Sequence, residues 1–100
     1  MGKITEIIKK NIRVIPNFPK KGIQFQDIFS LTEKGKILSE IIKEISNYSK
    51  KNKITKIIGI ESRGFIFAAA AAIKHNLGFV PIRKKGKLPG KVYKKKYKLE

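Results

Sequence analysis

A strand–turn–helix–strand pattern in the second half of this 100-residue chain constrains its fold more than any other feature. Ile54–Ile60 is a β-branched run that stops at the short polar turn Glu61–Gly64, and the Ala-rich helical stretch Phe65–Asn76 begins at once. A second apolar run, Phe79–Ile82, follows. Strand, helix and strand within about thirty residues form a βαβ unit with parallel strands and a right-handed crossover. The sequence therefore predicts an α/β protein built on a parallel sheet.

The first half of the chain is predicted to hold two amphipathic helices. Residues 3–12 place isoleucines on one helical face and lysines on the other, and residues 33–48 repeat this pattern with Thr32 as the predicted N-cap. Residues 23–28, between the helices, are expected to be extended. Residues 49–52 are polar and are predicted to form a loop.

Size and composition bound the class of protein. One hundred residues make one domain or part of one. No run of about 18 uncharged apolar residues occurs, so no membrane partner is expected. The absence of cysteine excludes a disulfide framework and thiolate chemistry. Because the N-terminus also lacks the hydrophobic region of a signal peptide, we expect a cytoplasmic protein.

The formal net charge of +17 raises the question of a nucleic-acid partner. Lysine supplies 21 of the 24 basic residues, and isoleucine outnumbers leucine by 18 to 5, a bias that AT-rich codons explain without any function. Arginine, which selective phosphate recognition prefers, occurs only at Arg13, Arg63 and Arg83. The positions of these arginines favour a small phosphate ligand, and we do not expect nucleic acid as a partner. A basic remnant that binds nucleic acid or another polyanion is the alternative.

Two polar segments follow the predicted strands. In the turn Glu61–Gly64, Gly64 lets the backbone approach a ligand, and Ser62 and Arg63 can donate hydrogen bonds to phosphate oxygens. Arg83–Lys87 places four basic side chains within five residues. Because parallel neighbours put both strand ends on one sheet edge, we expect the two segments to form two walls of one anion site. An ordinary βα turn and a solvated lysine-rich loop are the alternatives.

A third segment, Gln24–Asp27, carries an aromatic side chain. Phe25 offers a ring on which a purine can stack, a contact worth about 1–3 kcal/mol per base in nucleic-acid complexes. The neighbouring backbone groups of Gln24 and Gln26 can bind the edge of a purine. The alternative is that Phe25 is a core aromatic on a short strand. Asp27, the only aspartate of the chain, is expected to fix the loop rather than to touch a ligand.

Three blocks of the sequence resemble the adenine phosphoribosyltransferase family. They are Ile12–Pro19 with Gly22–Ile28, then Glu61–Phe65, then Phe79–Pro89, in the order of the family and at compatible spacing. The resemblance implies the α/β type I phosphoribosyltransferase fold, with a Rossmann-like parallel sheet that is incomplete in this chain. It also implies an N-terminal helix and a base-binding (hood) segment.

The resemblance implies a glycosyltransferase of purine salvage, which transfers the 5-phosphoribosyl group from phosphoribosyl pyrophosphate (PRPP) to adenine and yields AMP and pyrophosphate. It assigns to the adenine side Gln24, Phe25 and Gln26. It assigns to the PRPP or pyrophosphate side Glu61, Ser62, Arg63, Gly64, Arg83, Lys84 and Lys87. Glu100 is the implied catalytic residue, a carboxylate that assists proton handling at the base, and a frayed chain end without a role is the alternative. Mg²⁺ bound with PRPP is the implied cofactor, with no protein side chain identified as a metal ligand, and a homodimer is the implied assembly.

The resemblance divides one partial domain into three parts. These are residues 1–31 with the N-terminal helix and adenine-side segment, residues 32–90 with the βαβ part of the core, and residues 91–100 with the start of a mobile active-site loop. The family normally binds the ribose 5-phosphate after a later strand ending in two adjacent acidic residues, and no such pair occurs in this sequence. We therefore expect a fragment or truncated product that is poorly stable and inactive by itself. Another type I phosphoribosyltransferase with a different base remains the rival enzyme.

Overall fold

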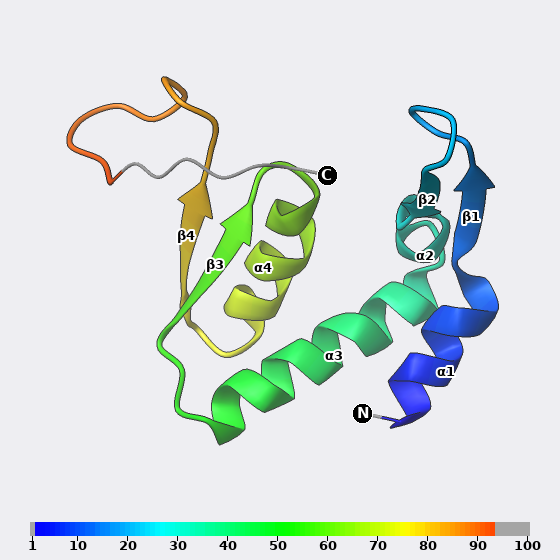
Figure 1. Cartoon of the computed structure of the whole chain (residues 1–100). Helices are drawn as coiled ribbons and strands as arrows, with labels where there is room; N and C mark the ends of the chain where they lie inside the picture. Colours follow the sequence, from blue (N-terminus) through cyan, green and yellow to red (C-terminus); the bar gives the residue numbers. More distant parts are fainter. Residues whose placement is uncertain (1, 94–100) are drawn as a thin grey trace. The chain divides into compact units, whose positions relative to one another are not determined.

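The computed structural model describes residues 2–93 and has the α/β character that the sequence predicts (Figure 1). The chain divides into two compact units, Met1–Ile54 and Thr55–Glu100, and each is considered by itself. Among the described residues, no helix combines the length and the apolar character needed to cross a membrane.

The first unit holds three helices and one antiparallel pair of strands. In chain order they are α1 (Gly2–Asn11), β1 (Arg13–Pro16), β2 (Gln24–Asp27), α2 (Phe29–Thr32) and α3 (Gly35–Lys51). The three helices contact one another. Each helix contributes a buried apolar side chain, namely Ile4, Leu31 and Ile41. The isoleucine faces predicted for both long helices are therefore used for packing, as expected for amphipathic helices.

Two local predictions in this unit are wrong, and one strand was not predicted. Thr32 does not cap α3; it ends the separate short helix α2, and the residue before α3 is Lys34, which makes no side-chain cap hydrogen bond. The predicted loop 49–52 is mostly helical, because the Ser49 hydroxyl is satisfied inside the helix by donating to the Ile45 carbonyl (2.8 Å). Strand β1 was not predicted at all. It ends at Pro16, which lacks an N–H but is tolerated at the end of an edge strand.

The β1–β2 pair is short and has a defined register. Arg13 lies opposite Asp27, and Ile15 lies opposite Phe25. Beyond the strands, Asn17 Oδ1 accepts a hydrogen bond from Gly22 N (2.9 Å), and Gly22 has the positive φ of +90° that a tight turn requires. These contacts close the hairpin.

The second unit is the predicted βαβ motif. β3 (Lys56–Ile60) leads into α4 (Arg63–Lys74), and β4 (Gly78–Ile82) returns parallel to β3. Ile60 pairs with Ile82 at the ends of both strands. β3 begins two residues later than predicted, because Ile54 N donates to the carbonyl of Ser49 in α3 (3.0 Å) instead of joining the strand.

Helix α4 packs on one face of the β3–β4 pair (Figure 1). On that face Phe65 and Phe79 form an edge-to-face ring pair with centroids 5.5 Å apart. The opposite face carries apolar side chains that are about half exposed, namely Ile58, Ile60, Val80 and Ile82. An apolar sheet face with this exposure is typical of an unfinished layer.

Gly59 allows α4 to approach β3 closely. A Cβ at this position would lie 2.9 Å from Ala68 Cβ, 2.9 Å from Phe79 Cε1 and 3.0 Å from the Gly64 carbonyl oxygen. We therefore expect Gly59→Ala to lower the free energy of unfolding by about 1–3 kcal/mol, the usual cost of overpacking. Gly35→Ala, where an added Cβ meets open space, is the matched control. Chemical denaturation followed by circular dichroism measures both, and equal stability of the two variants would contradict this packing.

Candidate functional site

The carboxyl ends of β3 and β4 lie at one edge of the parallel pair, and both predicted anion-binding segments start there. Glu61 follows β3, and Arg83 follows β4. The ladder extends one step past the strands, since Glu61 N donates to the Ile82 carbonyl (2.9 Å). The two segments are thus adjacent, as the sequence predicts for the end of a βαβ unit.

The Glu61 carboxylate joins the two segments. Its Oε1 accepts a short hydrogen bond from Lys84 N (2.7 Å) and lies 3.5 Å from Arg83 Nε. These three residues are called the Glu61 cluster below. The hydrogen bond from Lys84 N, followed by the positive charge of Arg83, lowers the pKa of Glu61 below its ordinary value. The carboxylate therefore stays ionised and holds the second segment against the first.

The loop after β4 is also braced from within. Arg83 Nη1 donates to the Lys87 carbonyl (3.1 Å), and Lys87 N donates to the Lys84 carbonyl (3.1 Å). Gly86 has a φ of +82°, which a turn in this loop needs and which glycine adopts without strain. The side chains of Lys84 and Lys87 remain exposed. The loop is thus a compact turn that presents lysine side chains to solvent.

The first helical turn of α4 faces the same edge. Ser62 precedes the helix and makes no side-chain cap hydrogen bond, and both Ser62 and Arg63 are exposed. The peptide bond between Glu61 and Ser62 is cis. A Cβ on Gly64 would make ordinary contacts with β3, the nearest being 3.7 Å from the Gly59 carbonyl carbon. The predicted role of Gly64, to let a ligand reach the backbone, stays a prediction.

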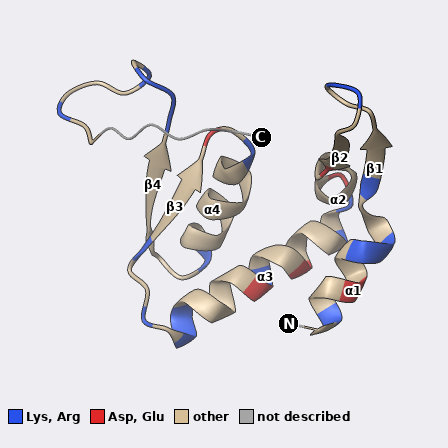
Figure 2. Cartoon of the chain, viewed as in Figure 1, with Lys and Arg blue, Asp and Glu red and all other residues tan. Residues whose placement is uncertain are grey.

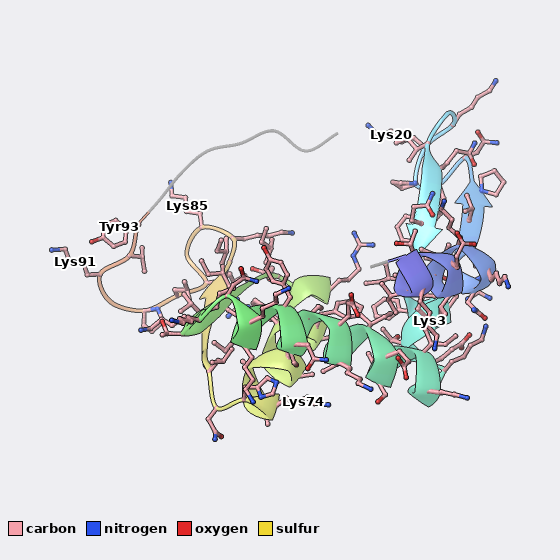
Figure 3. All side chains as sticks on the ribbon, turned by 90° about the horizontal axis from the view of Figure 1, so that it is seen from below. Lys3, Lys20, Lys74, Lys85, Lys91 and Tyr93 are labelled. Atoms are coloured by element: carbon pink, nitrogen blue, oxygen red, sulfur yellow. The ribbon has the colours of Figure 1, made fainter. Side chains whose placement is uncertain are left out.

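Positive charge dominates this edge. Figure 2 shows basic residues along the loop after β4 and at the start of α4, with an acidic residue at the end of β3. That acidic residue is Glu61. In Figure 3 the side chain of Lys85 extends away from the strands. The helix N-terminus and the exposed cations together can bind an anion with several oxygen atoms.

The predicted adenine-side residues lie on β2, in the first unit. Phe25 is half-buried, and its ring forms an edge-to-face pair with Phe18, with centroids 5.0 Å apart. Gln24 and Gln26 are exposed. Within residues 2–93, β2 has a partner strand along one edge only, so backbone groups of its other edge can serve a ligand.

Arg13 and Ser30 make contacts with Asp27 that were not predicted from the sequence. Asp27 fixes the segment after β2, as predicted, because its Oδ1 accepts a hydrogen bond from Phe29 N (3.2 Å). Its partners Arg13 and Ser30 were not predicted as site residues. The usable signal was that the only aspartate and one of three arginines flank a hairpin at positions that can pair. The predicted catalytic residue Glu100 lies outside the described residues.

The described side chains do not fit a protein-ligated metal ion. No group of three or more His, Cys, Asp or Glu residues within residues 2–93 could hold one. The carboxylate at the basic edge is Glu61, and its Oε1 already faces Lys84 N and Arg83. A divalent cation at this edge would need ligands from a bound phosphate compound rather than from these side chains.

Comparisons with known proteins point to one family, although no family model matches the chain. An adenine phosphoribosyltransferase of Clostridium botulinum is 48% identical over 93 residues, which cover 93% of this chain and 54% of the relative. The crystal structure of adenine phosphoribosyltransferase from Saccharomyces cerevisiae, complexed with adenine and an imino-altritol bisphosphate, has a TM-score of 0.86 at 34% identity, covering 94% of this chain and 58% of that one. The enzyme from Thermoanaerobacter pseudethanolicus gives a TM-score of 0.86 at 42% identity, covering 95% and 55%.

These likenesses confirm the predicted family resemblance and the predicted fold class. The chain spans about half the length of the curated relatives that it matches, which fits the prediction of a partial domain. The two TM-scores show that this chain shares the fold of these solved enzymes over rather more than half of their length. The polyanion-binding alternative is not favoured by these matches.

We expect the Glu61 cluster to depend on pH in a defined direction. Because the folded-state pKa of Glu61 is lowered, its stabilising contact is fully present above the ordinary glutamate pKa and is lost as the pH falls through the folded-state value. The backbone amide resonance of Lys84 should therefore shift in a transition below the ordinary glutamate pKa, measured by two-dimensional NMR.

Glu61→Gln removes this transition and speeds amide hydrogen exchange at Lys84, since glutamine keeps an acceptor oxygen but loses the charge that attracts Arg83. Glu6→Gln on the exposed part of α1 is the control and should leave the Lys84 transition unchanged. A Lys84 transition that survives in Glu61→Gln would show that another group controls this loop.

Proposed function

We propose that this chain supplies the adenine-side and pyrophosphate-side segments of an adenine phosphoribosyltransferase of purine salvage, which converts adenine and PRPP into AMP and pyrophosphate. The observation that carries the proposal is the Glu61 cluster, which holds the turn Glu61–Gly64 and the basic loop Arg83–Lys87 side by side at the carboxyl edge of a parallel strand pair. The relatives support the proposal, because an adenine phosphoribosyltransferase matches 93% of this chain.

The basic edge suits the leaving group of this reaction. When pyrophosphate departs from the anomeric carbon, negative charge grows on its oxygens, and fixed donors that face those oxygens lower the barrier. Arg63, Lys84 and Lys87 have exposed side chains, and the N-terminal turn of α4 lies at the same edge. These groups would bind the pyrophosphate part of PRPP.

Glu61 serves this site by position rather than by direct contact. A carboxylate beside pyrophosphate would repel it, and the Glu61 carboxylate instead accepts from Lys84 N and faces Arg83. We therefore assign Glu61 the role of holding the loop after β4. The family resemblance had instead implied that Glu61 binds substrate. Arg83 shares its charge between this carboxylate and any bound anion.

The adenine side combines a ring with an open strand edge. Phe25 would stack on the purine, and backbone groups of Gln24 and Gln26 would bind its edge. The S. cerevisiae relative is complexed with adenine, which supports adenine as the base that the complete enzyme binds.

The remaining features of the proposed enzyme are those that the family resemblance implies, and they belong to the proposal. Mg²⁺ would arrive with the phosphates of PRPP, since the described side chains do not fit a metal site of their own. Glu100 would assist proton handling at the base, and the complete enzyme would act as a homodimer in the cytoplasm. Adenine and PRPP are its proposed substrates, and residues 1–31, 32–90 and 91–100 its proposed functional parts.

The proposal predicts a specific loss on Arg63→Ala. A charge-assisted hydrogen bond contributes about 1.5–3 kcal/mol, so the dissociation constant of pyrophosphate should rise about tenfold or more. Lys74→Ala, at the other end of the same helix, removes one positive charge and is the matched control. Isothermal titration calorimetry of the two variants with pyrophosphate measures the difference.

Salt dependence separates this site from a polyanion surface. A surface that binds nucleic acid loses affinity steeply with salt and responds equally to Arg63→Ala and Lys74→Ala. Equal responses in calorimetry, together with tight binding of single-stranded RNA, would favour the polyanion binder over the enzyme.

We expect residues 1–100 alone to show no turnover of adenine and PRPP, because the chain has no adjacent acidic pair to bind the ribose. A coupled assay that detects pyrophosphate release measures this. Release of pyrophosphate at an ordinary enzymatic rate would refute the prediction that residues 1–100 are inactive without an acidic pair that binds the ribose.

A further inference from the structure

A group of polar contacts joins β1, β2 and α2. Arg13 donates to Asp27 Oδ2 from Nε (3.1 Å) and from Nη2 (2.8 Å). Ser30 Oγ donates to the Asp27 carbonyl (2.6 Å) and accepts a hydrogen bond from Arg13 N (2.9 Å). With the bond from Phe29 N to Asp27 Oδ1 (3.2 Å), both carboxylate oxygens have partners. The three residues Arg13, Asp27 and Ser30 are called the Asp27 cluster below.

Because the Asp27 carboxylate is largely buried, it requires particular hydrogen-bond partners. The Asp27 side chain is 12% exposed and Ser30 is 4% exposed, whereas the Arg13 side chain is 59% exposed. A carboxylate removed from water is tolerated only when its oxygens are hydrogen-bonded, so Asp27 demands its partners. Arg13 meets this demand with two nitrogens, a geometry that lysine cannot reproduce. The hydrogen bond and the charge of Asp27 raise the pKa of Arg13, which keeps the guanidinium charged.

The cluster sets the face on which Phe25 lies. Arg13 is the register partner of Asp27, and Phe25 lies two residues before Asp27, on the same face of β2. A slip of one residue would turn Phe25 to the opposite face. A hairpin of four-residue strands does not hold its register by itself, so contacts outside the ladder must select it.

We propose that Arg13, acting through Asp27, is a positioning residue for the base-binding segment Gln24–Gln26. This role rests on the proposed function, because only that function requires the segment to bind a purine. Arg13 does not touch the base. It holds the strand in the register that presents the ring of Phe25 and the backbone of its neighbours to the ligand.

Two variants of Arg13 test the role. Arg13→Gln is expected to raise the dissociation constant of adenine about tenfold or more, in line with the loss of a charge-assisted contact, and to leave that of pyrophosphate unchanged. Arg13→Lys keeps the charge but not the two-nitrogen contact, and should restore part of the adenine affinity. Lys21→Gln, which removes a positive charge from the loop of the same hairpin, is the control and should bind adenine normally.

Amide hydrogen exchange provides a readout of register. In Arg13→Gln the amides of Phe25 and Asp27 should exchange about tenfold faster, while the amides of α1 and α3 keep their protection. Asp27→Asn should show the same local change. Normal protection at Phe25 in both variants would overturn the proposal.

The binding results separate this proposal from the proposed function. Unchanged adenine affinity in Arg13→Gln would overturn the role of Arg13 alone, and leave the base site in place. Equal weakening of adenine and pyrophosphate would indicate general unfolding and would also overturn it. If the unmodified chain binds pyrophosphate but no adenine, the proposed function fails at its base site, and the positioning role fails with it.

Discussion

The parallel pairing of β3 and β4 is the constraint on which the basic edge depends. Because Ile60 pairs with Ile82, both strands end at the same level, and Glu61 meets the backbone of Lys84. Gly59 permits α4 to lie close against β3 and so places the first turn of the helix at the same edge. A different register would leave a polar turn and a lysine-rich loop with no shared chemistry.

Carboxylates organise both units of this very basic chain. Glu61 and Asp27 are two of only seven acidic residues, and each accepts a hydrogen bond from a backbone N–H and faces an arginine. Two of the three arginines therefore contact carboxylates, although the sequence suggested phosphate as their natural partner. In such a chain an acid supplies the fixed point around which positive groups are ordered.

Features encoded in contiguous stretches of sequence could be predicted, whereas features that depend on contacts between distant residues could not. The βαβ unit was predictable because its β-branched runs, its Ala-rich helix and its polar turns are contiguous. The contact from Lys84 N to Glu61 was not, because it depends on strand register across 23 residues. Strand β1 escaped prediction because Pro16 is an ordinary sign of a break, and only its place at the end of an edge strand makes it compatible with pairing.

The Asp27 cluster and the Glu61 cluster each close a short loop, and this has a consequence for the order of folding. Arg13 and Asp27 are 14 residues apart, and Glu61 and Lys84 are 23 apart. Loop-closure entropy rises with separation, so contacts of this kind cost less entropy to form than contacts between distant parts of the chain. Each unit also contains every residue of its own cluster. The hairpin of the first unit can therefore reach its final register during synthesis, before the ribosome has completed the second unit.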